Sequence, residues 1–251
     1  MTSFRAKLWT GVGVAVLIGS GGALDACSKP AKTPAPASSA SVSSEPAPVA
    51  AAAGEGGEAG ANNVFAGIPA DSLTALHLMH LKGFVLVAEA QPDGPSVAAI
   101  LVGQGMLEAY DPYKDIFKAS GLDEAVLRQA AKTGSAADLK AAQAAIEAAQ
   151  AKAGGEATPL AKAMVEIASN LYQEVGEGGI VDPTQYQHSY GASLSAKEAF
   201  TAAAKADPKA RAAKGDFDAF MKLWPGPTAP DKPTPAGQVL AQASRIELDL
   251  S

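Results

Sequence analysis

Cysteine, aromatic residues and charge are all scarce in this sequence. Of 251 residues, one is cysteine, 6% are aromatic and 18% are charged. A single cysteine excludes an intramolecular disulfide framework and any metal site built from several cysteines. The formal net charge of −6 argues against a protein that tracks nucleic-acid phosphates, so we expect no nucleic-acid partner.

The short motifs of common enzymes are also missing. The chain contains no G-x-S-x-G, no H-E-x-x-H and no P-loop. Its glycine-rich run at 54–57 follows no strand pattern, so it does not indicate a dinucleotide site. We therefore expect a protein without catalytic activity.

The first residues have the layout of an export signal. Arg5 and Lys7 precede a short apolar run over 8–18, which is too short to span a bilayer as a permanent helix. The only cysteine, Cys27, follows Ala26 in a sequence that resembles a bacterial lipoprotein cleavage box. We predict a signal peptide over 1–26 and lipidation of Cys27.

Lipidation would fix the location of the mature protein. Several acyl chains on one terminus give durable anchoring, which one chain does not. Ser28 follows the cysteine and favours sorting to the outer membrane of a Gram-negative bacterium. We therefore expect an outer-membrane lipoprotein that faces the periplasm, with the membrane as partner through its lipid anchor. The alternative is ordinary secretion after cleavage behind Ala23, which would leave a free thiol.

A low-complexity segment separates this anchor from the rest of the chain. Residues 27–63 are rich in proline, alanine, serine and glycine and have no apolar periodicity. Such a segment cannot bury enough surface to offset its ordering entropy. We predict a disordered tether over 27–63 and a single folded domain over 64–251.

The folded domain has the composition of an all-α protein. Alanine, the strongest helix former, is the most frequent residue, and no alternating strand pattern occurs. The apolar periodicity predicts a bundle of about seven helices, with 72–90 apolar nearly all round and hence central. The other expected segments are 96–109, 122–132, 135–153, 158–175, 183–205, one holding Phe217 to Trp224, and 237–248.

Two of the three histidines could share a ligand. His77 and His80 lie three residues apart, on one face of the predicted central helix, which suits a metal or haem. The ligand would be iron, haem or another transition metal. Candidates for a third ligand are His188, Glu89, Glu108, Asp111 and Met106. The alternative is that these are core histidines satisfied by carbonyls or tyrosines.

A proline-rich loop offers a possible surface for a protein partner. It begins at Trp224, Pro225, Gly226 and Pro227 and continues to Pro235. Exposed proline-rich segments bind partners with little loss of entropy, so Trp224, Pro225 and Pro227 are candidates for contacting another envelope protein. The alternative is a simple connection between helices.

Three segments carry a resemblance to known proteins. Residues 76–87, 181–187 and 244–248 resemble a poorly characterised family of helical exported bacterial proteins, and this likeness implies no particular activity. A more distant likeness is to imelysin-type periplasmic helical proteins, which are associated with iron uptake. Their Gly-x-His-x-x-Glu signature is absent, because His80, Gly83 and Gly191 stand three residues after the three histidines.

Together these patterns favour a non-catalytic, lipid-anchored binding or scaffolding protein of the cell envelope, with no cofactor. The alternative is a periplasmic metal- or haem-binding protein of an acquisition system that uses His77 and His80.

Overall fold

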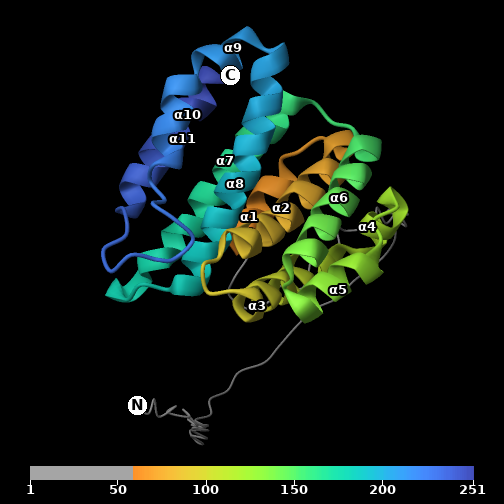
Figure 1. Ribbon diagram of the computed structural model, residues 1–251. Coiled ribbons are helices and arrows are strands. Elements are labelled where there is room, and N and C mark those ends of the chain that lie inside the picture. Colours follow the sequence, from red (N-terminus) through yellow and green to blue (C-terminus); the bar gives the residue numbers. More distant parts are fainter. Residues whose placement is uncertain (1–58) are drawn as a thin grey trace, which may run out of the picture. The chain divides into compact units, whose positions relative to one another are not determined.

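The computed structural model describes residues 59–251, which form helices and no strand (Figure 1). The predicted all-α helical bundle is confirmed. The α-helices are α1 (Ala59–Ala66), α2 (Ala70–Ala90), α3 (Pro95–Gly105), α4 (Lys114–Ser120), α5 (Glu124–Thr133), α6 (Ala136–Ala153), α7 (Ala157–Gln173), α8 (Pro183–Ala206), α9 (Pro208–Ala212), α10 (Lys214–Met221) and α11 (Ala236–Asp249). A π-helix, η1 (Met106–Tyr110), and two 3-10 helices, η2 (Asp111–Tyr113) and η3 (Glu174–Gly179), connect them.

Local sequence signals set several helix ends. Asp182 caps α8: its Oδ1 accepts hydrogen bonds from the backbone N–H groups of Thr184 and Gln185, at 2.8 and 3.1 Å, and proline opens the first turn. Asp123 and Ser135 cap α5 and α6 in the same way. These helices therefore begin within a residue or two of their predicted starts.

Two predicted boundaries differ from the structure. Helix α1 begins at Ala59, before the expected start of the domain at 64, because Ala61, Val64 and Phe65 form an apolar face that is buried in the core. The helix expected over 96–109 changes at Met106 from α- to π-helical geometry. This turn holds Glu108, whose carboxylate lies 3.5 Å from His188 Nδ1 on α8.

Helix α2 is central, as its nearly uniform apolar character predicts. It lies among α3, α6, α7 and α8 (Figure 1), and most of its side chains are buried. By length and composition it is the one helix within 59–251 that could cross a membrane, and 67% of its most apolar window is buried inside the bundle. It therefore has the placement of a core helix.

The core has two parts, and α2 contributes to both. One part gathers apolar side chains from α1, α7, α8 and the C-terminal helices, including Leu76 of α2. The other gathers those of α3 to α6 around Leu78, Leu81 and Phe84 of α2. The two faces of one helix thus join the halves of the domain.

Helices α2 and α8 cross at a pair of glycines. A Cβ built on Gly83 would lie 2.9 Å from the carbonyl carbon and oxygen of Gly191, and one built on Gly191 would lie 2.5 Å from the Gly83 carbonyl oxygen. The Ser195 hydroxyl, one turn along α8, donates a 2.6 Å hydrogen bond to the Met79 carbonyl. The two backbones can approach this closely only because neither glycine has a side chain.

Candidate binding site

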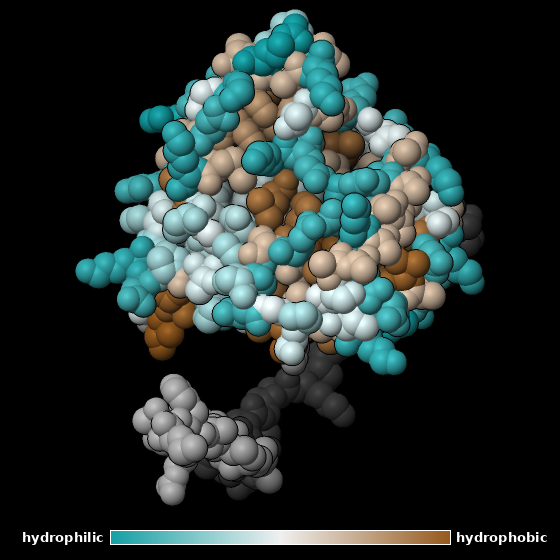
Figure 2. Space-filling model, viewed as in Figure 1, coloured by the Kyte–Doolittle hydropathy of each residue, from teal (hydrophilic) through white to brown (hydrophobic). Residues whose placement is uncertain are grey.

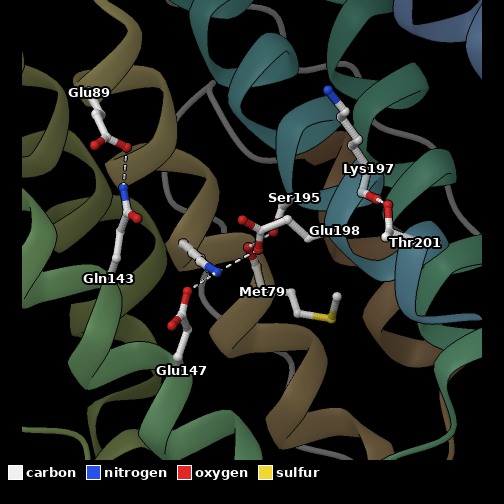
Figure 3. A network of polar contacts seen from close by, with 9 residues as sticks. Met79, Glu89, Gln143, Glu147, Ser195, Lys197, Glu198 and Thr201 are labelled. Carbon is white, nitrogen blue, oxygen red and sulfur yellow. Dashed lines mark hydrogen bonds and ion pairs between the residues drawn. The ribbon is translucent and has the colours of Figure 1, made fainter.

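The most strongly polar feature of the core is an ion cluster around Lys82, beside the glycine crossing (Figure 3). The Lys82 side chain on α2 is only 4% exposed, and its Nζ lies 2.7 Å from Glu147 Oε1 on α6 and 2.5 Å from Glu198 Oε2 on α8. A buried ammonium group is costly unless it is paired, and here two carboxylates that remain partly in water compensate it. The cluster ties α2, α6 and α8 together.

A groove lies next to this cluster, between α2 and α8. It has a volume of about 540 Å³, and Leu86, Ala90, Leu194 and Ala202 give it an apolar lining. In Figure 2, brown apolar surface is visible between teal side chains near the middle of the face, where α2 and α8 lie in Figure 1. A volume in this range suits a small molecule.

A smaller hollow also has Glu198 in its lining. It has a volume of about 260 Å³ and lies where α2, α7 and α8 meet the loop after α6, with Met79, Gly155 and Leu160 in its lining. Glu198 and Ala202 line both hollows. The ion pair to Lys82 therefore holds a carboxylate that the two hollows share.

The charged side chains of the larger groove differ in how they are engaged. Glu198 is paired with Lys82, and Glu89 Oε2 accepts a 2.6 Å hydrogen bond from the Gln143 amide on α6. Lys197 and Lys205 also line the groove, and within residues 59–251 no ion pair involves their ammonium groups. The Gln143 amide binds the Glu89 carboxylate without supplying a counter-charge.

His77 lies in an aromatic environment away from this groove. Its imidazole stacks on Phe65 of α1, with ring centroids 4.1 Å apart, and contacts the Tyr113 ring at 4.0 Å. Burial, together with the neighbouring His80, lowers the pKa of His77 to about 4. The imidazole is therefore neutral near pH 7 and packs as a core ring.

Within residues 59–251, His77 and His80 are not brought together with a third metal ligand. His80 contacts Phe65 and Phe84, at ring-centroid distances of 5.6 and 5.7 Å. In the part of the chain that the structure describes, no group of three His, Cys, Asp or Glu side chains could hold a metal ion. The surroundings of His77 and His80 fit the alternative of core histidines. That alternative named carbonyls or tyrosines as their partners, and the structure shows ring contacts with phenylalanines as well as with a tyrosine.

His188 is buried at a seam between helices. Its ring packs edge-on against Phe84 at 4.8 Å, and its Nδ1 lies 3.5 Å from Glu108 Oε2. Glu108 belongs to the π-helix η1, and the wider turn carries this carboxylate toward α8. Two of the third-ligand candidates, Glu108 and His188, therefore lie next to each other.

The prediction that Trp224 belongs to an exposed partner surface is wrong. Its side chain is 3% exposed and packs edge-on against Tyr172 and Phe220, and its indole N–H donates to the Ser189 hydroxyl at 3.2 Å. A large aromatic residue with a hydrogen-bond partner inside the core is stabilised there. The helix predicted to hold Phe217 to Trp224 ends at Met221, and the Trp224 side chain that follows it is buried in the core.

The loop after Trp224 is partly fixed to the bundle. Pro225 is exposed, whereas Pro227 is half-buried and its carbonyl accepts a 3.5 Å hydrogen bond from Gln91. The Tyr186 hydroxyl donates to the Gly226 carbonyl at 2.9 Å. These contacts fit a connection between α10 and α11. The predicted lipidation site, Cys27, lies outside the described residues.

Sequence reasoning missed the ion cluster entirely. Lys82 is one of the few charges on an otherwise apolar helix, and its partners lie 65 and 116 residues away. The available signal was the position of Lys82 in the middle of a helix predicted to be buried, because a buried lysine requires a carboxylate partner. Nothing in the local sequence identifies which carboxylates those are.

No protein-family model, curated protein or solved structure matches this chain. The fold and the site therefore define its class. It is an all-α bundle whose central helix is clamped by an interhelical ion cluster beside a surface groove.

Proposed function

We propose that this chain is a non-catalytic binding module of the bacterial cell envelope, held at the outer membrane through lipidated Cys27. In this proposal the segment before the helical domain is a tether, and the groove between α2 and α8 is the binding site. The observation that carries the proposal is that groove, with its apolar lining and the ion cluster that fixes its wall.

The arrangement of polar groups supports binding rather than chemistry. Lys82, the most deeply buried charge of the site, is engaged by two carboxylates, and Glu89 is engaged by an amide. The Lys82 ammonium group is thus occupied by interactions within the protein. Rigid side chains around an apolar hollow are what a small-molecule site requires.

The anchor is tested by metabolic labelling with a fatty-acid analogue. We expect the wild-type chain to be labelled and recovered with membranes, and a Cys27→Ser chain to be unlabelled. A labelled Cys27→Ser protein, or an unlabelled wild type with a titratable thiol, would contradict the anchor.

The binding site is tested separately, with exported, mature Cys27→Ser protein. Native mass spectrometry would detect small molecules that co-purify, and ligand-observed NMR would detect binding from a mixture of metabolites. We expect Leu194→Trp and Ala202→Arg, which fill the groove, to abolish the signals of bound ligands. Circular dichroism would confirm that both variants fold. Ligands that bind the variants as well as the wild type, or no ligand in either assay, would refute this site.

A further inference from the structure

We infer that the groove between α2 and α8 takes a small zwitterion with an apolar body, of about the size of a dipeptide. This inference rests on the proposed function and names the class of ligand for the same site. It follows from which charges of the groove remain available, where they stand, and what lies between them.

The α8 wall supplies available positive charge. Lys197, Thr201 and Lys205 succeed one another at intervals of four residues and so share one face of α8, and all three line the groove. The Thr201 hydroxyl donates to the Lys197 carbonyl at 2.7 Å, which leaves the two ammonium groups as the donors of this wall. Such a pair suits a carboxylate.

The α2 wall supplies available negative charge. Glu89 stands in the last turn of α2 and lines the same groove. Figure 3 shows Glu89 with Gln143 on one side of the Lys82 cluster, and Lys197 with Thr201 on the other. The Gln143 amide orients the carboxylate without neutralising it, so this wall suits an ammonium group.

The remaining acid of the groove does not compete for the ligand in the same way. Glu198 is bound to the buried Lys82 ammonium, which it shares with Glu147. Glu198 is therefore engaged within the protein, although one ammonium group for two carboxylates leaves the cluster with a net charge of −1. Glu89, Lys197 and Lys205 form no ion pair within 59–251. A ligand with one charge of each sign matches this arrangement better than a simple anion does.

The space between the charged walls is apolar and of limited size. Leu86 and Leu194, with Ala90 and Ala202, line a volume of about 540 Å³. Apolar side chains of a ligand would cover these residues, and the hydrophobic effect would supply part of the affinity. A dipeptide with two leucine side chains combines this body with an ammonium and a carboxylate group.

Three compounds with one skeleton test the assignment. Leucyl-leucine carries both charges, N-acetyl-leucyl-leucine carries only the carboxylate, and leucyl-leucinamide carries only the ammonium group. Binding to mature Cys27→Ser protein would be measured by isothermal calorimetry and by NMR chemical-shift perturbation. We expect leucyl-leucine to bind about twofold to fivefold more tightly than either derivative, as for solvent-accessible charge pairs.

Two variants then locate each charge. Lys197→Gln combined with Lys205→Gln should weaken leucyl-leucine and its N-acetyl derivative, and spare leucyl-leucinamide. Glu89→Gln keeps a side-chain carbonyl oxygen that can accept the hydrogen bond from Gln143. This variant should bind leucyl-leucine and leucyl-leucinamide more weakly and the N-acetyl compound as tightly as the wild type does. The matched control is Lys222→Gln with Lys232→Gln, which removes the same charge from exposed positions outside the groove and should change nothing.

The outcomes separate this inference from the proposed function. Absence of binding by all three compounds, equal affinity for all three, or equal weakening by the control variant would each overturn the zwitterion assignment. If leucyl-leucine fails while another ligand is lost in Leu194→Trp, the binding module stands and only its ligand class is wrong.

Discussion

At the scale of single residues, Lys82 is the most instructive position. Its ammonium group is buried, and the two carboxylates that bind it are about half exposed. The carboxylates would be solvated without the lysine, whereas the lysine would be left uncompensated without them. Loss of the two carboxylates should therefore destabilise the protein more than loss of the lysine does.

This asymmetry predicts the order of effects of substitution. Replacing both Glu147 and Glu198 with glutamine should lower the free energy of unfolding by about 3 kcal/mol, because it leaves a buried cation without a counter-charge. Lys82→Met, of similar shape, should cost about 1 kcal/mol or less. Urea denaturation of the variants measures both.

The triple variant is the control for this explanation. Lys82→Met added to the two glutamines should recover most of the loss, since no uncompensated charge remains. A triple variant as unstable as the double one would show that the glutamates act through packing.

His77 makes the stability depend on pH. Burial lowers the pKa of His77 to about 4 in the folded protein, from an ordinary value of 6.5, and His80 adds to the shift. The unfolded chain therefore takes up a proton before the folded one does as the pH falls. The contribution is fully present above pH 6.5 and is lost as the pH falls toward 4.

His77→Phe should remove this dependence and keep the stack on Phe65. Between about pH 7 and about pH 4, the wild type should lose about 3 kcal/mol more unfolding free energy than the variant. Urea titrations at several pH values give the dependence of the unfolding free energy on pH for the wild type and for the variant. The same dependence in both proteins would contradict a neutral, buried His77.

At the scale of helices, the crossing of α2 and α8 depends on the absence of two side chains. A methyl group on Gly191 would clash with the Gly83 carbonyl oxygen. That oxygen belongs to the backbone, so it cannot move aside as the end of a flexible side chain could. Separation of the helices would also pull Glu198 away from Lys82. The crossing therefore supports the site as well as the core.

Gly191→Ala should destabilise the protein by about 2 kcal/mol, although alanine is the better helix former. Gly103→Ala is the matched control, because a Cβ there meets nothing within 4 Å and lies in a regular helix. It should stabilise the protein by about 0.5–1 kcal/mol. Thermal unfolding measures the stability of both variants relative to the wild type. If both variants were stabilised, or both destabilised, the close approach of α2 and α8 at Gly191 would be contradicted.

The same scale shows how far the sequence predicts the structure. Periodicity and caps predicted α2, α6, α7 and α8, and the apolar circumference of α2 predicted its central place. The π-helical turn at Met106 could not be predicted from local propensity; in the structure this turn packs against α2, α3 and α5. The candidate site could not be predicted either, because its residues come from three helices that are distant in sequence.

At the scale of the whole molecule, α1 belongs to the folded domain. Ala61, Val64 and Phe65 are buried, and Phe65 covers His77. A chain that starts at residue 59 should therefore unfold like the mature protein. A chain that starts at residue 70 should lose about 4 kcal/mol, the order expected for exposing these side chains and their partners. Thermal and urea unfolding of the two chains test this boundary, and equal stabilities would place the domain start after α1.

The charge at the centre of α2 has a consequence for export. A segment as apolar as 70–90 risks lateral release into lipid while a chain threads a translocation channel, and a lysine at mid-helix opposes insertion by about 3 kcal/mol. In a chain exported as we propose, Lys82 would let this segment pass through as a soluble one. The carboxylates that pair with Lys82 in the folded domain, those of Glu147 and Glu198, lie 65 and 116 residues further along the chain. They become available only when the domain folds and α2 is buried.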